Sequence, residues 1–330
     1  MANVVRKFVV DSFKNLHFRI FTVGYRDYGE SILSVIFNGD KPVFSAVTDC
    51  YQLGDPSYNH ISKILTNLGI EKIDYFIWTH PDNDHSVGIA DLLSRFDPQG
   101  TADVFLPQGL GAVQSMTKDA KASYDYICKK YNSKRKYCSR PLSIDYRNGQ
   151  ILNPVKDYIE FFDRKTSRKI NCEFAFLLPH SQMLERVIGS EKLTLNNLSI
   201  FYYVKFNGYM YIFGGDLDRQ SLQFLDLEQF QNVAFIKIPH HGSDKVISFP
   251  RGLINNGYRE AICTCTQFVN GVSNLPQDST LRQYQPFSKN IYRTTNGKDL
   301  YGCIDVNFDI SKLKTSVSLS GNTMIDYQMP

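Results

Sequence analysis

Two short polar segments hold most of the side chains in this sequence that could bind a metal ion. The first, Thr79–His85, has the sequence THPDNDH and places two histidines and two aspartates within six residues. The second, Pro239–Ser243, has the sequence PHHGS and holds two adjacent histidines. Imidazole and carboxylate groups together are typical ligands of zinc, manganese and iron. The two segments therefore predict a metal site to which both contribute.

An interpretation without a metal exists for the first segment. Asp and Asn residues in a loop before a helix also act as turn formers and N-caps, and Asp84 stands just before a helix that we expect to begin near Ser86. Capping explains one aspartate but not the whole cluster, because neighbouring carboxylates repel each other unless cations neutralise them. The four candidate ligands are His80, Asp82, Asp84 and His85.

Each polar segment follows an apolar run that has the composition of a buried strand, Tyr75–Thr79 before the first and Val233–Ile238 before the second. Two further aspartates, Asp49 and Asp216, also stand just after predicted strands. Loops that follow strand ends can converge on one place, so residues far apart in the sequence can share a metal site.

Strands and helices alternate along the chain, which is typical of the α/β class. The main strands are predicted at Arg19–Gly24, Ser31–Phe37, Pro42–Thr48, Tyr75–Thr79, Val104–Leu106, Tyr158–Phe162, Cys172–Leu178, Leu198–Phe206, Tyr209–Phe213, Val233–Ile238, Ala261–Thr266, Ile291–Thr294 and Cys303–Phe308. The helices are predicted at His60–Leu68, Val87–Phe96, about Met116–Tyr137 and Arg219–Phe230.

With these motifs in order, the sequence resembles the metallo-β-lactamase superfamily. It is most similar to the branch that includes the hydrolase domain of DNA-uptake competence proteins, which carries HxDxDH where most relatives carry HxHxDH. The HHGS motif at His240–Ser243 is the second specific element, and Gly29–Ser31 and Gly215-Asp216 are weaker ones. The resemblance implies an α/β protein, a four-layer αββα sandwich, as a single domain over residues 1–330.

The resemblance also implies a centre of two divalent cations, Zn²⁺ or Mn²⁺. The implied ligands are His80 and Asp82 for the first cation and Asp84, His85 and His240 for the second. Asp216 would bridge the two cations. Because an aspartate replaces the usual histidine at position 82, manganese is as plausible as zinc.

Two further residues are expected near this centre. The family usually supplies one more histidine before the bridging aspartate, and His180 is the only candidate, with a surface-loop histidine as the alternative interpretation. Asp49 is expected to orient a ligand histidine by accepting a hydrogen bond from the ring nitrogen that faces away from the metal.

Hydrolysis is the expected reaction, because two cations about 3.5 to 4 Å apart can turn a bridging water into hydroxide and neutralise developing charge. Asp84 could orient that hydroxide. His241, Ser243 and Lys245, close to His240 in the sequence, could contact a phosphate or protonate a leaving oxygen.

The substrate is suggested by an uneven distribution of charge. The net charge of the whole chain is +4, but Lys118–Lys169 contains fourteen Lys and Arg against six Asp and Glu, and several tyrosines interleave with them. Basic residues with aromatics suit phosphate backbones and stacked bases. A solvated helical face followed by a lysine-rich loop is the alternative. We expect an insertion at about 112–170 that carries this basic, Tyr-rich composition.

The leading hypothesis is therefore a nuclease or phosphodiesterase that acts on DNA or RNA, for which a multi-component system with a protein partner, such as phage defence, is one setting. The alternatives are a hydrolase of small molecules (a lactone, thioester or nucleotide messenger) and a metal-binding interaction subunit. No signal peptide or membrane span is evident, and the seven cysteines form no CxxC pair. Reduced, structural cysteines and a cytoplasmic location are expected.

Overall fold

Two large mixed β-sheets form the centre of the protein in the computed structural model, which describes residues 6–26, 28–113, 115–138, 155–180, 194–254, 260–286, 288–312 and 314–328. The eight-stranded sheet has, in spatial order, β18 (Lys314–Gly321), β17 (Gly302–Asp309), β2 (Leu16–Gly24), β3 (Glu30–Asn38), β4 (Lys41–Thr48), β5 (Tyr75–Ile77), β6 (Asp103–Pro107) and β7 (Arg135–Cys138). Its strands from β4 to β7 are parallel to one another.

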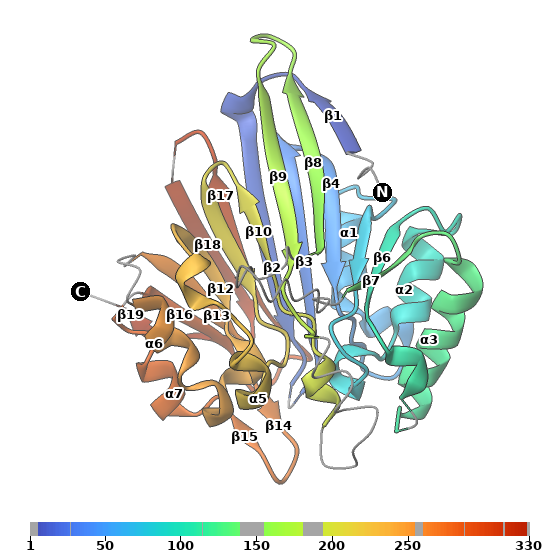
Figure 1. Cartoon of the computed structure of the whole chain (residues 1–330), viewed down its shortest axis with the longest axis vertical. Helices are drawn as coiled ribbons and strands as arrows, with labels where there is room; N and C mark the ends of the chain where they lie inside the picture. The colour runs from blue at the N-terminus through green and yellow to red at the C-terminus, as the bar shows by residue number, and fades with distance from the viewer. Residues whose placement is uncertain are drawn as a thin grey trace, which may run out of the picture.

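The nine-stranded sheet lies against the first (Figure 1). Its strands are, in spatial order, β1 (Arg6–Val10), β8 (Val155–Asp163), β9 (Lys169–Phe176), β10 (Tyr202–Phe206), β11 (Tyr209–Phe213), β12 (Val233–Lys237), β13 (Ala261–Cys265), β16 (Ser288–Thr294) and β19 (Thr323–Gln328). A short hairpin of β14 (Phe268–Val269) and β15 (Asn274–Leu275) follows β13 and stands outside both sheets.

Alternation along the strands explains why the sheets pack on both faces. In β3, Ile32 and Ile36 belong to the core between the sheets, whereas Leu33 and Val35 face the helices. Successive side chains of a strand point to opposite faces, so a strand that is covered on both sides is apolar almost throughout. Across the interior, the rings of Phe44 and Phe174 join the two sheets, with centroids 5.7 Å apart.

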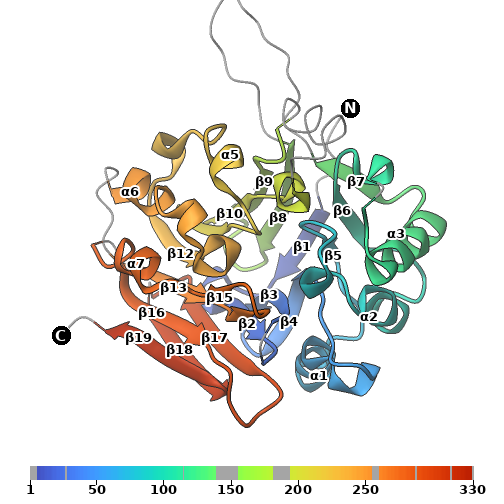
Figure 2. The same ribbon diagram turned by 90° about the horizontal axis from the view of Figure 1, so that it is seen from below.

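Helices cover the outer face of each sheet (Figures 1 and 2). On the eight-stranded sheet these are α1 (His60–Asn67), α2 (Ile89–Phe96) and α3 (Lys118–Lys130); on the nine-stranded sheet they are α5 (Arg219–Leu222), α6 (Phe249–Ile254) and α7 (Asp278–Arg282). The layers therefore run helix, sheet, sheet, helix, and the predicted four-layer αββα sandwich is confirmed. Among the described helices, none is long and apolar enough to cross a membrane.

Two predicted helices are shorter than expected. The helix predicted to reach Tyr137 ends at Lys130, and the chain then enters β7, which pairs with β6. The helix predicted over Arg219–Phe230 is only one turn, α5, followed by a separate 3-10 turn at Leu227–Gln229. The Asp226 side chain accepts a hydrogen bond from the N–H of Glu228 and so starts a new turn. Local capping and pairing with a neighbouring strand override helical periodicity at both places.

Candidate metal centre

The polar segments meet at one end of the sandwich. The loop after β5 carries His80 to His85, the loop after β11 carries Asp216, and the loop after β12 carries His240 and His241. Since β11 and β12 are parallel, the loops that follow them leave the nine-stranded sheet at the same end of the strands. Figure 2 views the molecule from this end. The convergence of loops that the sequence predicts is present in the structure.

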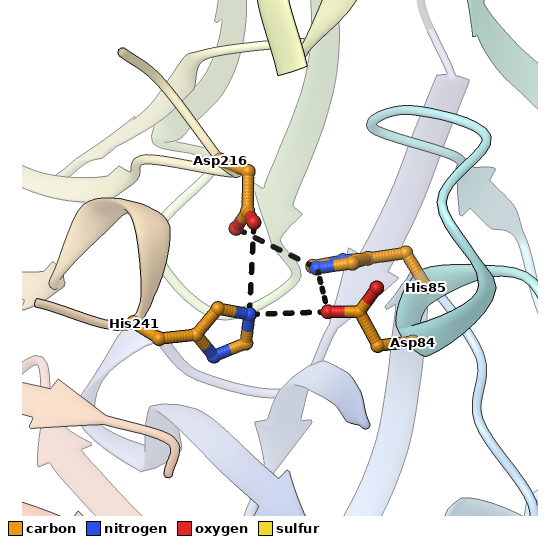
Figure 3. Close-up of side chains that lie close together, drawn as sticks. All are labelled: Asp84, His85, Asp216 and His241. Carbon is orange, nitrogen blue, oxygen red and sulfur yellow. Dashed lines mark ion pairs between the residues drawn. The ribbon is translucent and has the colours of Figure 1, made fainter. Parts of the chain in front are cut away.

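Four side chains form a compact cluster there, namely Asp84, His85, Asp216 and His241 (Figure 3). The Nε2 atom of His85 lies 3.3 Å from Oδ2 of Asp84 and 3.5 Å from Oδ1 of Asp216. The Nε2 atom of His241 lies 3.3 Å from Oδ2 of Asp84 and 3.6 Å from Oδ2 of Asp216. All four residues are buried. Each histidine thus faces one oxygen of each aspartate.

These separations suit ligands around one cation. Zinc holds nitrogen and oxygen ligands at about 2.0 to 2.2 Å in a tetrahedron, which places neighbouring ligand atoms roughly 3.3 to 3.6 Å apart. The four measured separations fall in that interval, and they are longer than typical N–H···O hydrogen bonds. The geometry of the cluster therefore fits a bound divalent cation.

Unsatisfied polar atoms support the same conclusion. Within the described part of the chain, the buried Nε2 atoms of His80, His85 and His241 and the Oδ1 atom of Asp216 have no hydrogen-bond partner. Buried polar groups are nearly always paired, so each exception needs an explanation. A cation in the cluster would satisfy the atoms of His85, His241 and Asp216, and a cation beside it would satisfy that of His80.

A second group of possible ligands adjoins the cluster. His80 Nε2 lies 3.5 Å from Oδ2 of Asp82 and 3.9 Å from Oδ2 of Asp216. His80 is fully buried, whereas the Asp82 side chain is 35% exposed. Asp216 therefore stands between the two groups, in the position that a bridging ligand would need. The His80 side has fewer protein ligands and is more open than the Asp84 side.

His240 and His241 differ from the sequence expectation. His241, not His240, has its ring in the cluster. The Nε2 atom of His240 lies 3.2 Å from the side-chain nitrogen of Asn196, and its Nδ1 atom lies 3.3 Å from the carbonyl oxygen of Leu217. Both histidines have left-handed backbone angles, with φ of 49° and 48°, so the chain turns sharply here and presents the second ring to the site. The structure therefore brings His241, and not His240, into the group of possible ligand atoms.

Asp49 lies beside His85, as expected of a residue that orients a ligand. Its Oδ2 atom lies 2.7 Å from Nδ1 of His85 and accepts a hydrogen bond of 2.6 Å from the Thr79 hydroxyl. Its Oδ1 atom accepts from the Thr79 backbone N–H. Asp49 is fully buried and has three donors, so it needs no cation itself. Its hydrogen bond leaves Nε2 of His85 as the atom that faces the cluster.

Electrostatic shifts in the cluster reflect its crowded charges. Burial would raise the pKa of Asp216, but the neighbouring histidines, His241 first, lower it below its ordinary value. The same competition, with His85 as the largest favourable neighbour, lowers the pKa of Asp84. Burial opposes protonation of His85, yet Asp84, Asp216 and Asp49 raise its pKa well above the usual range. The two cluster carboxylates are thus ionised and available as ligands.

Other predicted site residues lie outside the cluster. His180 stacks on the ring of Phe224, with centroids 4.3 Å apart, and is not part of the group of ligand atoms. The Ser243 hydroxyl accepts a hydrogen bond from the backbone N–H of Lys245 and so caps the turn after the HHGS motif. The Lys245 side chain is exposed. Asp84 does not cap the following helix, since Gly88 occupies the N-cap of α2.

The sequence did not predict a role for three buried residues in the surroundings of His241, although one of them, Glu30, lies in the Gly29–Ser31 motif. They are Glu30, Lys237 and Thr266, which are 1%, 0% and 0% exposed. The Lys237 ammonium lies 2.6 Å from Oε2 of Glu30. A lysine at the end of an apolar strand with the composition of a buried one was the available signal, because lysine is almost never fully buried unless it is paired.

The basic, Tyr-rich segment is divided by the fold. Helix α3 borders the site, since the Thr117 hydroxyl donates to Oδ1 of Asn83 at 2.5 Å and the Ser123 hydroxyl donates to the carbonyl of Ser86. The turn between β8 and β9 lies at the opposite end of the sheets, at the top of Figure 1. Residues 139–154 lie outside the described residues. Only part of the basic segment is therefore near the cluster.

Comparisons with known proteins add little to this geometry. No protein-family model and no curated protein sequence matches the chain. Among solved structures, the metallo-β-lactamase fold protein YhfI from Bacillus subtilis is similar, with a TM-score of 0.33 and 12% identity over 78% of this chain and 75% of that chain. Rm3 metallo-β-lactamase gives a TM-score of 0.25 and 12% identity over 70% and 71%. The fold described above therefore rests on the two sheets and their helices.

Proposed function

We propose that this protein is a hydrolase that uses two divalent cations, Zn²⁺ or Mn²⁺, and that it cleaves phosphodiester bonds in DNA or RNA. The observation that carries the metal-dependent part is the convergence of unsatisfied ligand atoms from Asp216, His85 and His241 at separations that fit one cation. A set of nitrogen and carboxylate ligands without a thiolate suits both metals.

The protein residues divide into two ligand groups around Asp216. Asp84, His85 and His241 would hold one cation, and His80 and Asp82 would hold the other. When bound, divalent cations polarise the bond to be cleaved, lower the pKa of a water molecule and neutralise negative charge that develops in hydrolysis. The residues of the chain contribute by fixing the ligand atoms before the substrate arrives.

Positive charge beside the site supports a phosphate-containing substrate. Helix α3 begins at Lys118, one residue after Thr117, whose hydroxyl contacts Asn83 in the metal-binding loop. Lys118 is exposed at this end of the helix. On the other side, Lys245 is exposed just after the HHGS motif. Cations on both sides of a site attract a polyanion and raise its rate of association.

Aromatic rings next to His241 support recognition of bases. The Phe268 ring of the β14–β15 hairpin stacks on His241, with centroids 5.1 Å apart and planes at 30°. Tyr28, which is 38% exposed, lies against Phe268 and Tyr51, with centroid separations of 6.1 and 5.4 Å. Exposed aromatic rings beside a cationic groove are sites on which bases stack, at about 1 to 3 kcal/mol per base. Tyr28 is the ring of this group that is most open to a base.

The experiment that tests this function is a cleavage panel. Purified protein loaded with Mn²⁺ or Zn²⁺ would be offered single-stranded DNA, double-stranded DNA, RNA and bis(p-nitrophenyl) phosphate, with a lactone and a thioester for comparison. We expect cleavage of at least one nucleic acid that disappears in Asp84→Asn. Hydrolysis of the lactone or thioester alone would contradict the phosphodiester assignment and favour the small-molecule alternative.

A matched pair of tyrosines tests base recognition in the same assay. Tyr28→Ala should raise KM for the nucleic acid about 5- to 150-fold, the range that loss of one stacked base implies. Tyr58→Ala is the control, because Tyr58 is similarly exposed, at 46%, and has no ring contact with Phe268 or Tyr51 among the described residues. Equal effects of the two changes would contradict a role of Tyr28 in stacking.

One observation favours a smaller substrate. Several Lys side chains of the predicted basic segment form ion pairs with carboxylates, for example Lys136 with Asp157 at 2.6 Å and Lys156 with Glu173 at 2.9 Å. A Lys or Arg side chain in an ion pair attracts a polyanion less strongly than one without a carboxylate partner. A nucleotide messenger, which is a small phosphodiester, is therefore the second candidate and belongs in the panel. The protein partner and a setting such as phage defence stay predictions, which co-purification of the tagged protein would test.

A further inference from the structure

A buried chain of polar side chains leads from the interior of the sandwich to His241. The Lys237 ammonium, at the end of β12, lies 2.6 Å from Oε2 of Glu30 and 3.1 Å from the carbonyl oxygen of Ile238. The Thr266 hydroxyl, one residue past β13, donates to the same oxygen of Glu30. Its oxygen lies 2.8 Å from Nδ1 of His241. These contacts link both sheets, since Glu30 is the first residue of β3.

The direction of each hydrogen bond follows from counting donors. Lys237 has only donors, and an ionised carboxylate has only acceptors. The Lys237 ammonium lies 2.6 Å from Oε2 of Glu30, so this carboxylate oxygen accepts from Lys237. A threonine hydroxyl has one hydrogen, which Thr266 gives to Glu30. Its oxygen must then accept from His241, and the proton of that ring stands on Nδ1.

We propose that Glu30, Lys237 and Thr266 form a positioning network that fixes the tautomer and orientation of His241. The network keeps the lone pair of Nε2 directed at Asp84 and Asp216, the form of imidazole that binds a cation. This inference rests on the proposed function only in that His241 binds metal. It does not depend on which substrate is cleaved.

The other side of the site follows the same logic with different residues. Asp49 accepts from Nδ1 of His85 directly, and the Thr79 hydroxyl gives its hydrogen to Asp49. The Thr79 oxygen lies 3.0 Å from Nδ1 of His80 and must therefore accept from that ring. In all three histidines Nδ1 is thus taken up by a supporting hydrogen bond and Nε2 is the atom that faces the cluster, which agrees with the lack of hydrogen-bond partners for Nε2 within the described chain.

A purely structural role for Glu30 and Lys237 is the competing explanation, because the ion pair also ties β3 to β12. A buried ion pair is weak evidence of stability, since desolvation of two charges offsets most of their attraction. The Thr266 link separates the two explanations. Thr266→Val leaves the ion pair intact and removes only the hydroxyl that joins it to His241.

The experiment compares cobalt binding by wild type, Thr266→Val, Thr266→Ser and Thr264→Val, with calorimetry and the absorption spectrum of bound Co²⁺ as readouts. Thr264→Val is a matched control, because Thr264 is also fully buried next to the end of β13 and its hydroxyl lies 3.0 Å from that of Thr22 in the other sheet. We expect Thr266→Val to weaken binding at one of the two sites about 10- to 100-fold and to change its spectrum. Thr266→Ser and Thr264→Val should stay within about threefold of wild type.

The tautomer can also be observed directly in the zinc-loaded protein. Long-range ¹⁵N–¹H NMR of this protein should show the proton of His241 on Nδ1 and none on Nε2. The Thr266→Val variant should lose this uniform state.

Two results would overturn the network: cobalt binding by Thr266→Val equal to wild type, or a wild-type His241 with its proton on Nε2. Cobalt binding that depends on Thr266 in a protein that cleaves no phosphodiester would instead reject the proposed substrate and support the network.

Discussion

The two metal-binding loops differ in how directly their sequences map onto the site. In the loop after β5, His80, Asp84 and His85 all face Asp216, which is the arrangement that the family resemblance implies. In the loop after β12, only the second of two adjacent histidines does so. The first loop places its ligands with a 3-10 turn, Asn83–His85, whose start has ordinary backbone angles.

The second loop depends on an unusual backbone. His240 and His241 are both in the left-handed region, which costs side chains other than glycine of order 1 to 3 kcal/mol per residue. Such strain persists where the surrounding structure requires it, often at functional sites. The comparison shows that motif spacing identifies ligands when the backbone is regular and is ambiguous when adjacent residues share a strained turn.

The largest effect is expected when each of the two adjacent histidines is replaced by alanine in turn, which tests directly how the two loops differ. His241→Ala removes a proposed ligand. It should therefore weaken metal binding by more than roughly 100-fold, which is the cost of losing a residue that only supports a ligand through a hydrogen bond. His240→Ala should retain metal, since the ring of His240 contacts Asn196 and Leu217 instead. Calorimetric titration with Zn²⁺ would measure both. Loss of metal in His240→Ala alone would restore the original assignment.

The first loop can be tested through its support rather than its ligands. Asp49→Asn keeps the shape of the side chain but replaces an acceptor of the His85 hydrogen bond with an amide. We expect metal affinity to fall about 10- to 100-fold. Asp55→Asn is the control, because Asp55 only caps the turn at Pro56–Tyr58. If both changes left the affinity unaltered, Asp49 would have no orienting role.

The strained turn of the second loop predicts a difference between two glycines. Gly242 has φ of +75°, and a Cβ atom there would lie 2.7 Å from Cβ of Pro276. Gly39 has φ of +63° and open space around it. Gly39→Ala should cost about 1 kcal/mol of unfolding free energy, and Gly242→Ala about 2 to 4 kcal/mol because crowding adds to strain. Urea unfolding would compare them, and equal costs would contradict the tight packing of the HHGS turn.

The smallest expected effect concerns His60, which belongs to neither of the two loops. Burial lowers the pKa of His60 to about 4, and its ring stacks on Tyr301 with centroids 3.4 Å apart. The unfolded chain then binds more protons, so the stability gained from neutral His60 is present above about pH 6.5 and is lost as the pH falls toward 4. His60→Gln should make the unfolding free energy less dependent on pH across that window. An unchanged pH slope would show that His60 is not buried as described.

The sequence predicted most of the fold because its strands are short apolar runs between clear turns. The bounds of β3, β4, β11 and β17 agree with expectation to within one or two residues. The edge strands β1, β18 and β19 were not predicted. Much of β18 is exposed and polar, so its alternation carries little signal. The predicted length of a helix was wrong where a polar side chain began a new turn, as at Asp226.

The candidate site was predicted in part for the same physical reason. Ligands on one loop could be recognised from spacing, and Asp49 from its place after a strand. The residues that support His241 could not be predicted, because Glu30 and Lys237 lie in β3 and β12 and Thr266 follows β13, and tertiary packing sets which of these elements are neighbours in space. Only the isolated buried lysine gave a local sign of it.

Metal content tests the central claim most directly. Purified wild-type protein, incubated with Zn²⁺ or Mn²⁺ and freed of excess metal, would be compared by elemental analysis with Asp216→Asn, which alters the carboxylate between the two ligand groups. The structure predicts one tightly held cation at the Asp84 side, a second that is lost more easily from the more open His80 side, and a clear loss in the variant. Wild-type protein without stoichiometric metal, or a variant with the same content, would contradict a metal centre at this site.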